Sequence, residues 1–271
     1  MHKDRTVTIQ PRYYRLFTDP GIEQAVSNYA YAELDWEIPL DEAALVCLDV
    51  WNRTPWAATD TQDRGEEIVR TKIVPVLETC RAQGMQVVHA PANPVAPKSP
   101  NWVDLIDDDE PQPAYPKSPD WPPADFRRKT GRYAMYARPQ EPQEEAGAKF
   151  SAEERDFHPL VRPVDDEAVI ANGEELHRLC AQRDILHLFY VGFHTNACIV
   201  IRDYGVYHML YRGYHTILIR DCTTGMELHD TQDELICTRG QIASLEQFDV
   251  YTITSNQMIC SLQRGGAIQE S

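Results

Sequence analysis

The chain has 271 residues, of which 42% are hydrophobic, so it is long and apolar enough to form a packed domain and is not a disordered chain. Its formal net charge of −16 disfavours nucleic acid and anionic membrane surfaces as partners, because an acidic surface repels phosphate groups. No apolar run approaches the ~20 residues that span a bilayer, and the first residues lack the apolar stretch of a signal peptide.

The first block with the pattern of a folded domain runs from about residue 42 to 90. The run ALVCLDV at 44–50 is typical of a strand that is buried on both faces of a parallel sheet. A helix is predicted at 64–83, where apolar residues recur on one face, and the run MQVVHA at 85–90 predicts a second strand. This order of strand, helix and strand indicates a parallel pair joined by a crossover.

Residues 91–163 differ in composition from the segments on either side. They hold fourteen of the nineteen prolines, and the element P-K-S-P-[Asn/Asp]-W occurs in them twice, at 97–102 and 116–121. Chain this rich in proline is not regular secondary structure, whereas its tryptophans and tyrosines argue against disorder. We therefore expect a single domain over 1–271 with an ordered insertion at 91–163, acting as a lid or as an oligomer interface.

The second block, 164–260, alternates strands with helices. Four strands are predicted at 167–171, 185–192, 215–221 and 248–254, with helices at 173–182, 197–212 and 230–246. Together the two blocks predict an α/β fold with a doubly wound, six-stranded parallel sheet of order 3-2-1-4-5-6. In that order the first and fourth strands are neighbours, and ligands bind in the crevice beyond their carboxyl ends.

Cys198 lies where the fourth strand gives way to a helix, in the segment GFHTNACI at 192–199. Thr195 or Asn196 is expected to cap that helix, whose N-terminus would favour the thiolate and lower the pKa of Cys198. Backbone N–H groups of the same turn would receive an oxyanion. The alternative is that Cys198 is a small buried hydrophobic residue.

The seven cysteines as a set bear on the cell compartment. They are widely spaced and never form a C-x-x-C pair, which argues against a disulfide framework and a zinc ribbon. Free thiols are typical of reducing surroundings, so a cytoplasmic protein is expected.

Asp49 ends the first strand, so the expected strand order places it in the same crevice as Cys198. Burial raises the pKa of a carboxyl group, which suits Asp49 to accept a thiol proton and later return it. The alternative is an aspartate of a turn or a cap. The pair predicts acyl transfer on a small-molecule substrate without a cofactor.

Three segments resemble the isochorismatase-like cysteine hydrolases, which include nicotinamidases and N-carbamoylsarcosine amidase. ALVCLDV is similar to the family's ALLVIDMQ, GFHTNACI to its G-x-x-T-x-x-C-V, and YRGYHTILIRD at 211–221 to its G-Y-x-V-x-V-V-x-D-A. The combination of D-x-W-N with G-x-H-T-N-x-C looks like a larger subgroup of that superfamily. The resemblance covers roughly 42–90 and 164–260.

The resemblance implies a homo-oligomeric hydrolase that cleaves the C–N bond of a small amide or ureide through a thioester, without a cofactor. In it Cys198 is the nucleophile and Asp49 the general base. It also implies a cis peptide between Phe193 and His194, and an oxyanion held by the backbone N–H groups of His194 and Cys198.

The sequence departs from the family at the third catalytic residue, a lysine that ends strand 3. The corresponding stretch, 167–173, contains no lysine, and Asn172 is its positional stand-in. Alternatively, a lid formed by the insertion supplies the cation in place of the family lysine, from Lys129, Lys149 or Arg162. The histidines that bind metal after strand 2 in nicotinamidases are also missing, so no metal site of that kind is expected.

Several further residues are candidates for the crevice. His194 either orients substrate or fills the turn, and Trp51 and Asn52 are candidate pocket residues. Arg202 lies one helical turn beyond Cys198, where it binds a substrate carboxylate or forms a salt bridge with a neighbour. Asp221 ends the fifth strand, either at the crevice rim or in a turn.

Two other functions remain open. One is an isochorismatase-type hydrolase that cleaves a vinyl ether by acid catalysis, with Asp49 acting without the thiol. The other is a non-catalytic scaffold that has lost the family lysine. In that case Cys198 would be no more reactive than a free thiol.

Overall fold

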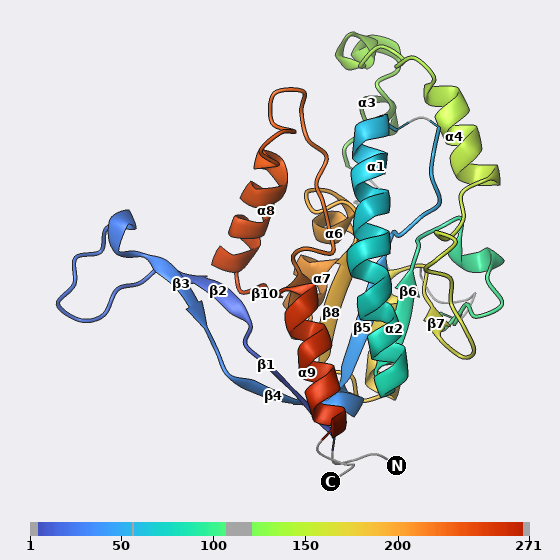
Figure 1. The fold of residues 1–271 in the computed structure, drawn as a ribbon. Coiled ribbons are helices and arrows are strands. Elements are labelled where there is room, and N and C mark those ends of the chain that lie inside the picture. Colours follow the sequence, from blue (N-terminus) through green and yellow to red (C-terminus); the bar gives the residue numbers. More distant parts are fainter. Residues whose placement is uncertain (1–4, 56, 107–120, 268–271) are drawn as a thin grey trace.

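A mixed sheet with helices on both faces forms the centre of the protein (Figure 1). The computed structural model describes residues 5–55, 57–106 and 121–267. Each of the six predicted strands is present: β5 (Ala43–Leu48), β6 (Gln86–Ala90), β7 (Ala168–Val169), β8 (His187–Gly192), β9 (His215–Ile219) and β10 (Tyr251–Ile253). They are mutually parallel and run in the order β10-β9-β8-β5-β6-β7 across the sheet.

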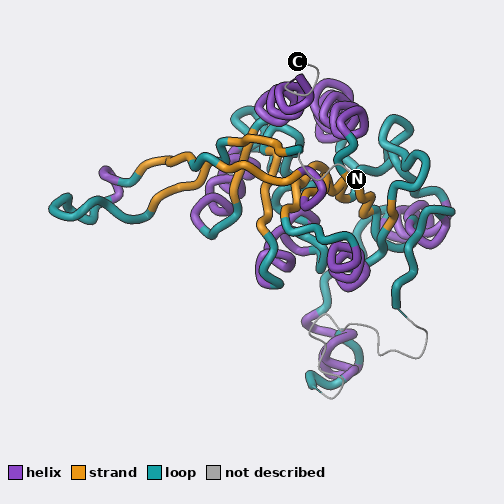
Figure 2. Tube along the Cα trace, turned by 90° about the horizontal axis from the view of Figure 1, so that it is seen from below, coloured by secondary structure: helices purple, strands orange, loops and turns teal. Residues whose placement is uncertain are grey.

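The predicted α/β fold with six parallel strands is confirmed, and within the described residues two antiparallel strands that were not predicted extend the sheet to eight. β2 (Arg12–Arg15) pairs with β10, and β3 (Ala30–Glu33) pairs with β2. These strands and the loop between them project from the body of the protein as an arm (Figures 1 and 2). A separate two-stranded sheet joins β1 (Thr6–Ile9) to β4 (Trp36–Pro39). Strands of four residues are too short to give a clear alternation of apolar and polar side chains.

Two apolar clusters explain why the central strands are continuously hydrophobic. Leu45 and Cys47 of β5 face one cluster, which includes residues of α2 (Val74–Gln83) and α9 (Ser255–Ala267). Ala44, Val46 and Leu48 face the other, which includes α5 (Gly173–Gln182), α7 (Val206–Tyr211) and α8 (Ile236–Gln247). Both faces of β5 are therefore covered, as expected for a parallel strand.

The helices agree with the predicted ones in part. α5 has the predicted bounds, whereas α8 begins six residues later than predicted and α9 was not predicted. The helix expected at 64–83 is longer, because α1 (Thr59–Ile68) continues through a π-helical turn (Val69–Ile73) into α2. Short 3-10 helices occur at Val26–Asn28, Leu40–Glu42 and Ala96–Lys98. Within the described residues, no helix is both long and apolar enough to cross a membrane.

The Pro-rich insertion contains some regular structure where it is described. It holds α3 (Ala124–Arg128), a 3-10 helix (Gly131–Tyr136) and α4 (Glu144–Glu153). Most of the second P-K-S-P-D-W element lies outside the described residues. The role of the insertion as a lid or an oligomer interface stays a prediction.

The helix expected at 197–212 is broken in two, which corrects the prediction. α6 (Cys198–Ile201) ends at Arg202, whose backbone is extended with φ −65° and ψ 145°. α7 begins after Gly205, where an added Cβ would lie 2.6 Å from the carbonyl oxygen of Ile199. Only glycine fits this turn, and the turn directs Arg202 and Tyr204 toward the end of β5.

Gly192 joins β8 to the turn that carries Cys198, and it offers a test of this packing. Its φ is +127°, and an added Cβ would lie 1.9 Å from the Leu48 carbonyl oxygen of the neighbouring strand. We expect Gly192→Ala to lower the free energy of unfolding by roughly 3 kcal/mol or more, measured by urea denaturation.

The matched control is Gly84→Ala, at φ +72° with no neighbouring atom within 4 Å of the added Cβ. It should cost only the roughly 1–2 kcal/mol of a left-handed backbone. Equal losses in the two variants would contradict the close approach of β5 and β8.

Candidate active site

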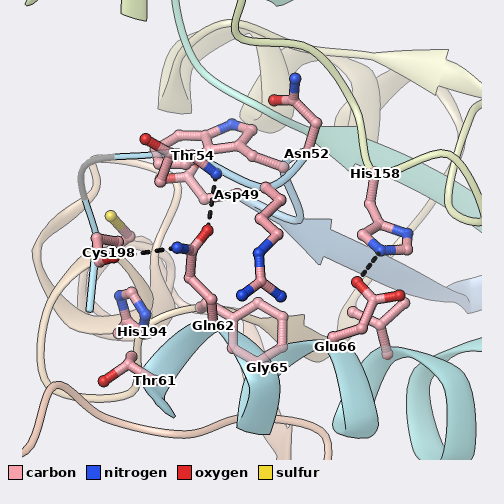
Figure 3. A pocket seen from close by; sticks show the side chains of 15 residues that line it. Asp49, Asn52, Thr54, Thr61, Gln62, Gly65, Glu66, His158, His194 and Cys198 are labelled. Atoms are coloured by element: carbon pink, nitrogen blue, oxygen red, sulfur yellow. Dashed lines mark hydrogen bonds and ion pairs between the residues drawn. The ribbon is translucent and has the colours of Figure 1, made fainter. Parts of the chain in front are cut away.

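The carboxyl ends of β5 and β8 bring Asp49 and Cys198 together. Leu48 and Gly192 are paired across the two strands, and Asp49 follows the first of them directly. Asp49 is 2% exposed and takes a left-handed backbone with φ 49°. Cys198 is partly exposed, and its thiol and the Asp49 carboxylate each shift the pKa of the other, so the two groups lie close together. Both side chains face the pocket shown in Figure 3.

Asp49 is held by hydrogen bonds from Arg202 and Tyr204. The Arg202 Nε atom donates to Asp49 Oδ2 at 2.8 Å, and the Tyr204 hydroxyl donates to Oδ1 at 3.1 Å. Burial raises the pKa of Asp49, although Arg202, Cys198 and Tyr204 oppose that rise by stabilising the charged form. The expected raised pKa of Asp49 is therefore confirmed.

The expected lowered pKa of Cys198 is wrong. Burial raises the pKa of the thiol to about 12, and the neighbouring Asp49 charge adds to the rise. Arg202 lowers the pKa but does not outweigh these two effects. α6 is a single turn, so its N-terminus contributes little. The sulfur of the resting protein is therefore a thiol.

The capping expectation is also wrong. The N-cap of α6 is Ala197, without a side-chain hydrogen bond. Thr195 instead shares a hydrogen bond of 2.8 Å with the hydroxyl of Thr223. Asn196 accepts from the backbone N–H of Met226 and donates to its carbonyl. Both side chains thus fix the loop after β9 against the turn before Cys198, and neither lines the pocket.

The turn itself carries the expected cis peptide between Phe193 and His194, which confirms that prediction. The His194 side chain lines the pocket. Burial lowers the pKa of His194, and the positive charge of Arg64 lowers it further. Among the described residues, the backbone N–H groups of His194 and Cys198 donate to no backbone carbonyl.

The pocket has a volume of about 120 Å³, which suits a small molecule. Its lining mixes apolar and polar side chains: Asp49, Trp51, Asn52, Arg53, Thr54, Ala57, Thr61, Gln62, Gly65, Glu66, Val69, His158, Phe193, His194 and Cys198. The expected pocket residues Trp51, Asn52 and His194 are among them. α1 forms one wall of the pocket. Glu66 and His158 line the side of the pocket opposite Cys198 (Figure 3).

The pair formed by Glu66 and His158 was missed by sequence reasoning. His158 Nδ1 accepts the backbone N–H of Leu160 at 3.2 Å, so its Nε2 carries the proton and donates to Glu66 Oε2 at 2.8 Å. This bond, together with Arg70, lowers the pKa of Glu66. The only sequence signal was a histidine in a Pro-rich segment and a glutamate on a helix, which form no motif.

Asn172 and Asp221 lie outside the pocket. Asn172 is the N-cap of α5, where its side chain accepts from the N–H groups of Glu174 and Glu175. Asp221 accepts from the backbone and hydroxyl of Ser255 at the start of α9. Both are therefore helix-terminus residues, and the expectation that they contribute to the pocket is corrected.

None of the lysines or arginines expected from a lid is the cation beside Asp49. Lys129 lies 3.5 Å from the centroid of the Phe126 ring, within the insertion. Lys149 pairs with Glu153, and Arg162 pairs with Asp156. Arg202 forms the salt bridge with a neighbour that was one of its two alternatives.

In the described part of the chain, no group of three or more His, Cys, Asp or Glu side chains is arranged to hold a metal ion.

Comparison with known proteins gives one family. The model of the isochorismatase domain matches residues 43–245, which run from β5 into α8 and include Asp49 and Cys198. No curated protein matches the chain.

A solved structure has the same fold. A cysteine hydrolase from Pseudomonas syringae pv. phaseolicola 1448A is 15% identical, with a TM-score of 0.54, over 85% of this chain and 96% of that one. At this identity the likeness shows the fold alone. An isochorismatase family protein from Desulfovibrio vulgaris subsp. vulgaris str. Hildenborough is 14% identical, with a TM-score of 0.49, over 82% of this chain and 99% of that one.

The raised pKa of the thiol predicts how Cys198 responds to pH. Because only the thiolate reacts, the rate of iodoacetamide labelling at Cys198 should rise about tenfold per pH unit from pH 8 to 10 and should not level off near neutrality. Labelling is followed by mass spectrometry of the Cys198 peptide, with the Cys260 peptide as an internal reference. A plateau near pH 7 would show a depressed pKa and contradict this assignment.

Asp49→Asn removes the negative charge that raises the thiol pKa and leaves Arg202 in place. The pKa of Cys198 should therefore fall, and labelling at pH 8 should become at least about tenfold faster than in the unaltered protein. Slower or unchanged labelling would show that the two groups do not interact electrostatically.

Proposed function

Because the chain belongs to the isochorismatase family, we propose that it is a cysteine hydrolase that cleaves the C–N bond of a small amide or ureide. The observation that carries this proposal is that the Cys198 thiol and the buried Asp49 carboxylate line one small pocket, close enough that each shifts the pKa of the other. A nucleophile beside its base is the arrangement that acyl transfer requires. Within the described residues, two N–H groups of the adjoining turn are free of backbone acceptors, which supports an oxyanion site there.

The first half of the reaction forms a thioester. As the sulfur attacks the carbonyl carbon, the thiol proton passes to Asp49 and the carbonyl oxygen becomes an oxyanion, which the N–H groups of His194 and Cys198 receive. The C–N bond then breaks, and the amine leaves with the proton from Asp49. A thiol with a pKa of about 12 is a weak nucleophile, so proton transfer accompanies the attack instead of preceding it.

The second half reverses these roles. Asp49 takes a proton from water, the resulting hydroxide adds to the thioester carbonyl, and the C–S bond breaks. The proton returns to the sulfur, which restores the starting thiol. Asp49 suits both directions because burial raises the pKa of its carboxyl group while hydrogen bonds from Arg202 and Tyr204 keep it in place.

Arg202 supplies the positive charge that the sequence lacks at the end of the third strand. Its guanidinium lies 2.8 Å from Asp49 and also lowers the pKa of Cys198. Arginine keeps its proton, so Arg202 stabilises negative charge on the carboxylate and the sulfur without transferring a proton itself. Arg202 thus replaces the positive charge of the family lysine but cannot transfer a proton.

Cys198→Ala separates this proposal from its rivals. A panel of small amides and ureides is assayed for amine or ammonia release, and turnover should fall by roughly 10³-fold or more in the variant. Acid-quenched mass spectrometry of the unaltered protein should show an acyl group on the Cys198 peptide. Full amine release in Cys198→Ala would show that the thiol is not the nucleophile. Cleavage of a vinyl ether at equal rates by both proteins, without amide turnover, would favour the mechanism that needs only Asp49, and no turnover or acylation with any substrate would favour a scaffold.

Replacing Arg202 tests its electrostatic role. Arg202→Met should lower kcat/KM by roughly 10²-fold and lower the unfolding temperature, because Asp49 then stays buried without its cation. Arg202→Lys keeps the charge and should recover most of the loss in both quantities. Arg53→Met is the control, since Arg53 lines the same pocket but pairs with the exposed Asp63. If Arg202→Met is as active as Arg53→Met, Arg202 has no role in the reaction.

A further inference from the structure

The two edges of the central sheet differ in how they end. At one edge the insertion bonds to β7: the Val103 N–H donates to the Val169 carbonyl at 2.9 Å, and the Val169 N–H donates to the Asn101 carbonyl at 3.0 Å. At the other edge β3 pairs with β2 on one side, and no strand of the described residues pairs with it on the other side. The sheet is therefore covered by the insertion at β7 and open at β3.

The hydrogen-bond pattern of the arm shows which backbone groups lie at this open edge. The Leu34 N–H donates to the Pro11 carbonyl at 3.1 Å, directly beside the paired residues of β2 and β3. Inward and outward groups alternate along an antiparallel strand, so Ala32 turns its N–H and C=O toward β2, whereas Tyr31 and Glu33 turn theirs away. An unpaired row of this kind is a template for another strand.

The arm that carries this edge, residues 12–33, has no core of its own. None of its residues is buried. Its base is held to the body, where Arg12 donates to Glu246 at 2.9 Å, but its tip projects away from the body (Figures 1 and 2). Large apolar side chains near the tip are more than half exposed: Phe17, Ile22 and Val26. Because a two-stranded hairpin alone is at best marginally stable in water, a second surface that covers the tip would stabilise the arm.

A second copy of the chain satisfies the edge and the tip together. About a twofold axis, β3 of one copy meets β3 of the other as an antiparallel pair, and the same groups bond in both directions. Because β3 runs from the tip of the arm to its base, this pairing lays each tip along the base of the other arm. A register with Tyr31 opposite Glu33 of the second copy keeps the two carboxylates apart, since like charges directly opposite each other are destabilising.

Size and charge also fit a second copy. The arm has 22 residues, and a stable interface takes about 20–30 residues from each side. The arm contains two arginines and three acidic residues, a net charge of −1 in a chain whose net charge is −16. Two acidic copies therefore repel each other least where their arms meet.

We propose that the open edge of β3 is the dimerisation surface of this protein. Two copies join their central sheets into one continuous sheet through antiparallel pairing of β3, and the tip of each arm packs on the other copy. The inference goes beyond the hydrolase proposal and does not depend on it. It also differs from the prediction that the Pro-rich insertion forms the oligomer interface, and the experiments below separate the two surfaces.

Glu33→Pro tests the outward N–H group directly. Proline lacks this donor but is tolerated at a strand edge that faces away from the sheet, so the variant should fold, as checked by circular dichroism. The dimer dissociation constant, measured by sedimentation velocity over a range of concentrations, should rise at least about tenfold, because the twofold axis doubles the loss of each bond. Glu33→Ala is the matched control: it keeps the N–H, and its constant should stay within about threefold of the unaltered protein.

Amide hydrogen exchange tests the same edge without any variant. In the dimer the Tyr31 and Glu33 amides should be protected, and they should exchange rapidly once the protein is diluted below its dissociation constant. The Ala32 amide, which faces β2, is the internal reference and should stay protected at both concentrations. Rapid exchange of Tyr31 and Glu33 at every concentration, with Ala32 protected, contradicts the pairing even if Glu33→Pro fails to fold.

A pair of equally exposed apolar residues separates the arm from the insertion. Val26 at the tip of the arm is 78% exposed, and Met135 in the insertion is 79% exposed. Val26→Asp should raise the dimer dissociation constant at least about tenfold, whereas Met135→Asp should leave it unchanged. The opposite result would assign the interface to the insertion and overturn the proposal.

Three further outcomes overturn the role of β3. The first is an unaltered protein that sediments as a monomer at all concentrations. The second is a folded Glu33→Pro variant that assembles as the unaltered protein does. The third is an equal loss of assembly in Glu33→Pro and Glu33→Ala, which would show that the side chain and not the strand edge makes the contact. None of these results bears on the chemistry of Cys198, so the hydrolase proposal is tested separately.

Discussion

The buried carboxylate of Asp49 is the constraint on which the site depends. An ionised group at 2% exposure is stable only with donors around it, and Asp49 has two, the Arg202 guanidinium and the Tyr204 hydroxyl, with the Cys198 thiol close by. All three groups come from the short segment 198–204 after β8. The helical break between α6 and α7, with Gly205 at its end, is the local structure that lets one segment supply all of them.

The segment from Asp49 to Asn52 links the chemistry of the site to its boundary. Asp49 faces Cys198, Trp51 faces the pocket, and Asn52 holds the backbone on either side of Arg155. This short segment thus places a carboxylate and an aromatic wall at the pocket, and it fixes the end of the distant insertion beside them.

Electrostatics distinguish this site from one with a preformed thiolate. Burial and a neighbouring carboxylate both raise the pKa of Cys198, and the charge of Arg202 compensates only in part. The resting pair is therefore a thiol beside a carboxylate, and negative charge reaches the sulfur only during attack. Arg202 and the N–H groups of the turn are arranged to stabilise charge at that moment.

The sequence by itself determined the six parallel strands, the helix α5 and the meeting of Asp49 with Cys198. These follow from local information, since continuous apolar runs identify buried strands and strand order brings two strand ends together. It did not determine β2 and β3, because four-residue strands carry too little periodicity. Only the tertiary structure decided which cation meets Asp49 and where the insertion is held. Arg202 turns toward Asp49 because a helix breaks, and Asn52 binds backbone that lies more than 100 residues away in the chain. Such pairings depend on how distant segments pack, and no local pattern of residue types encodes that.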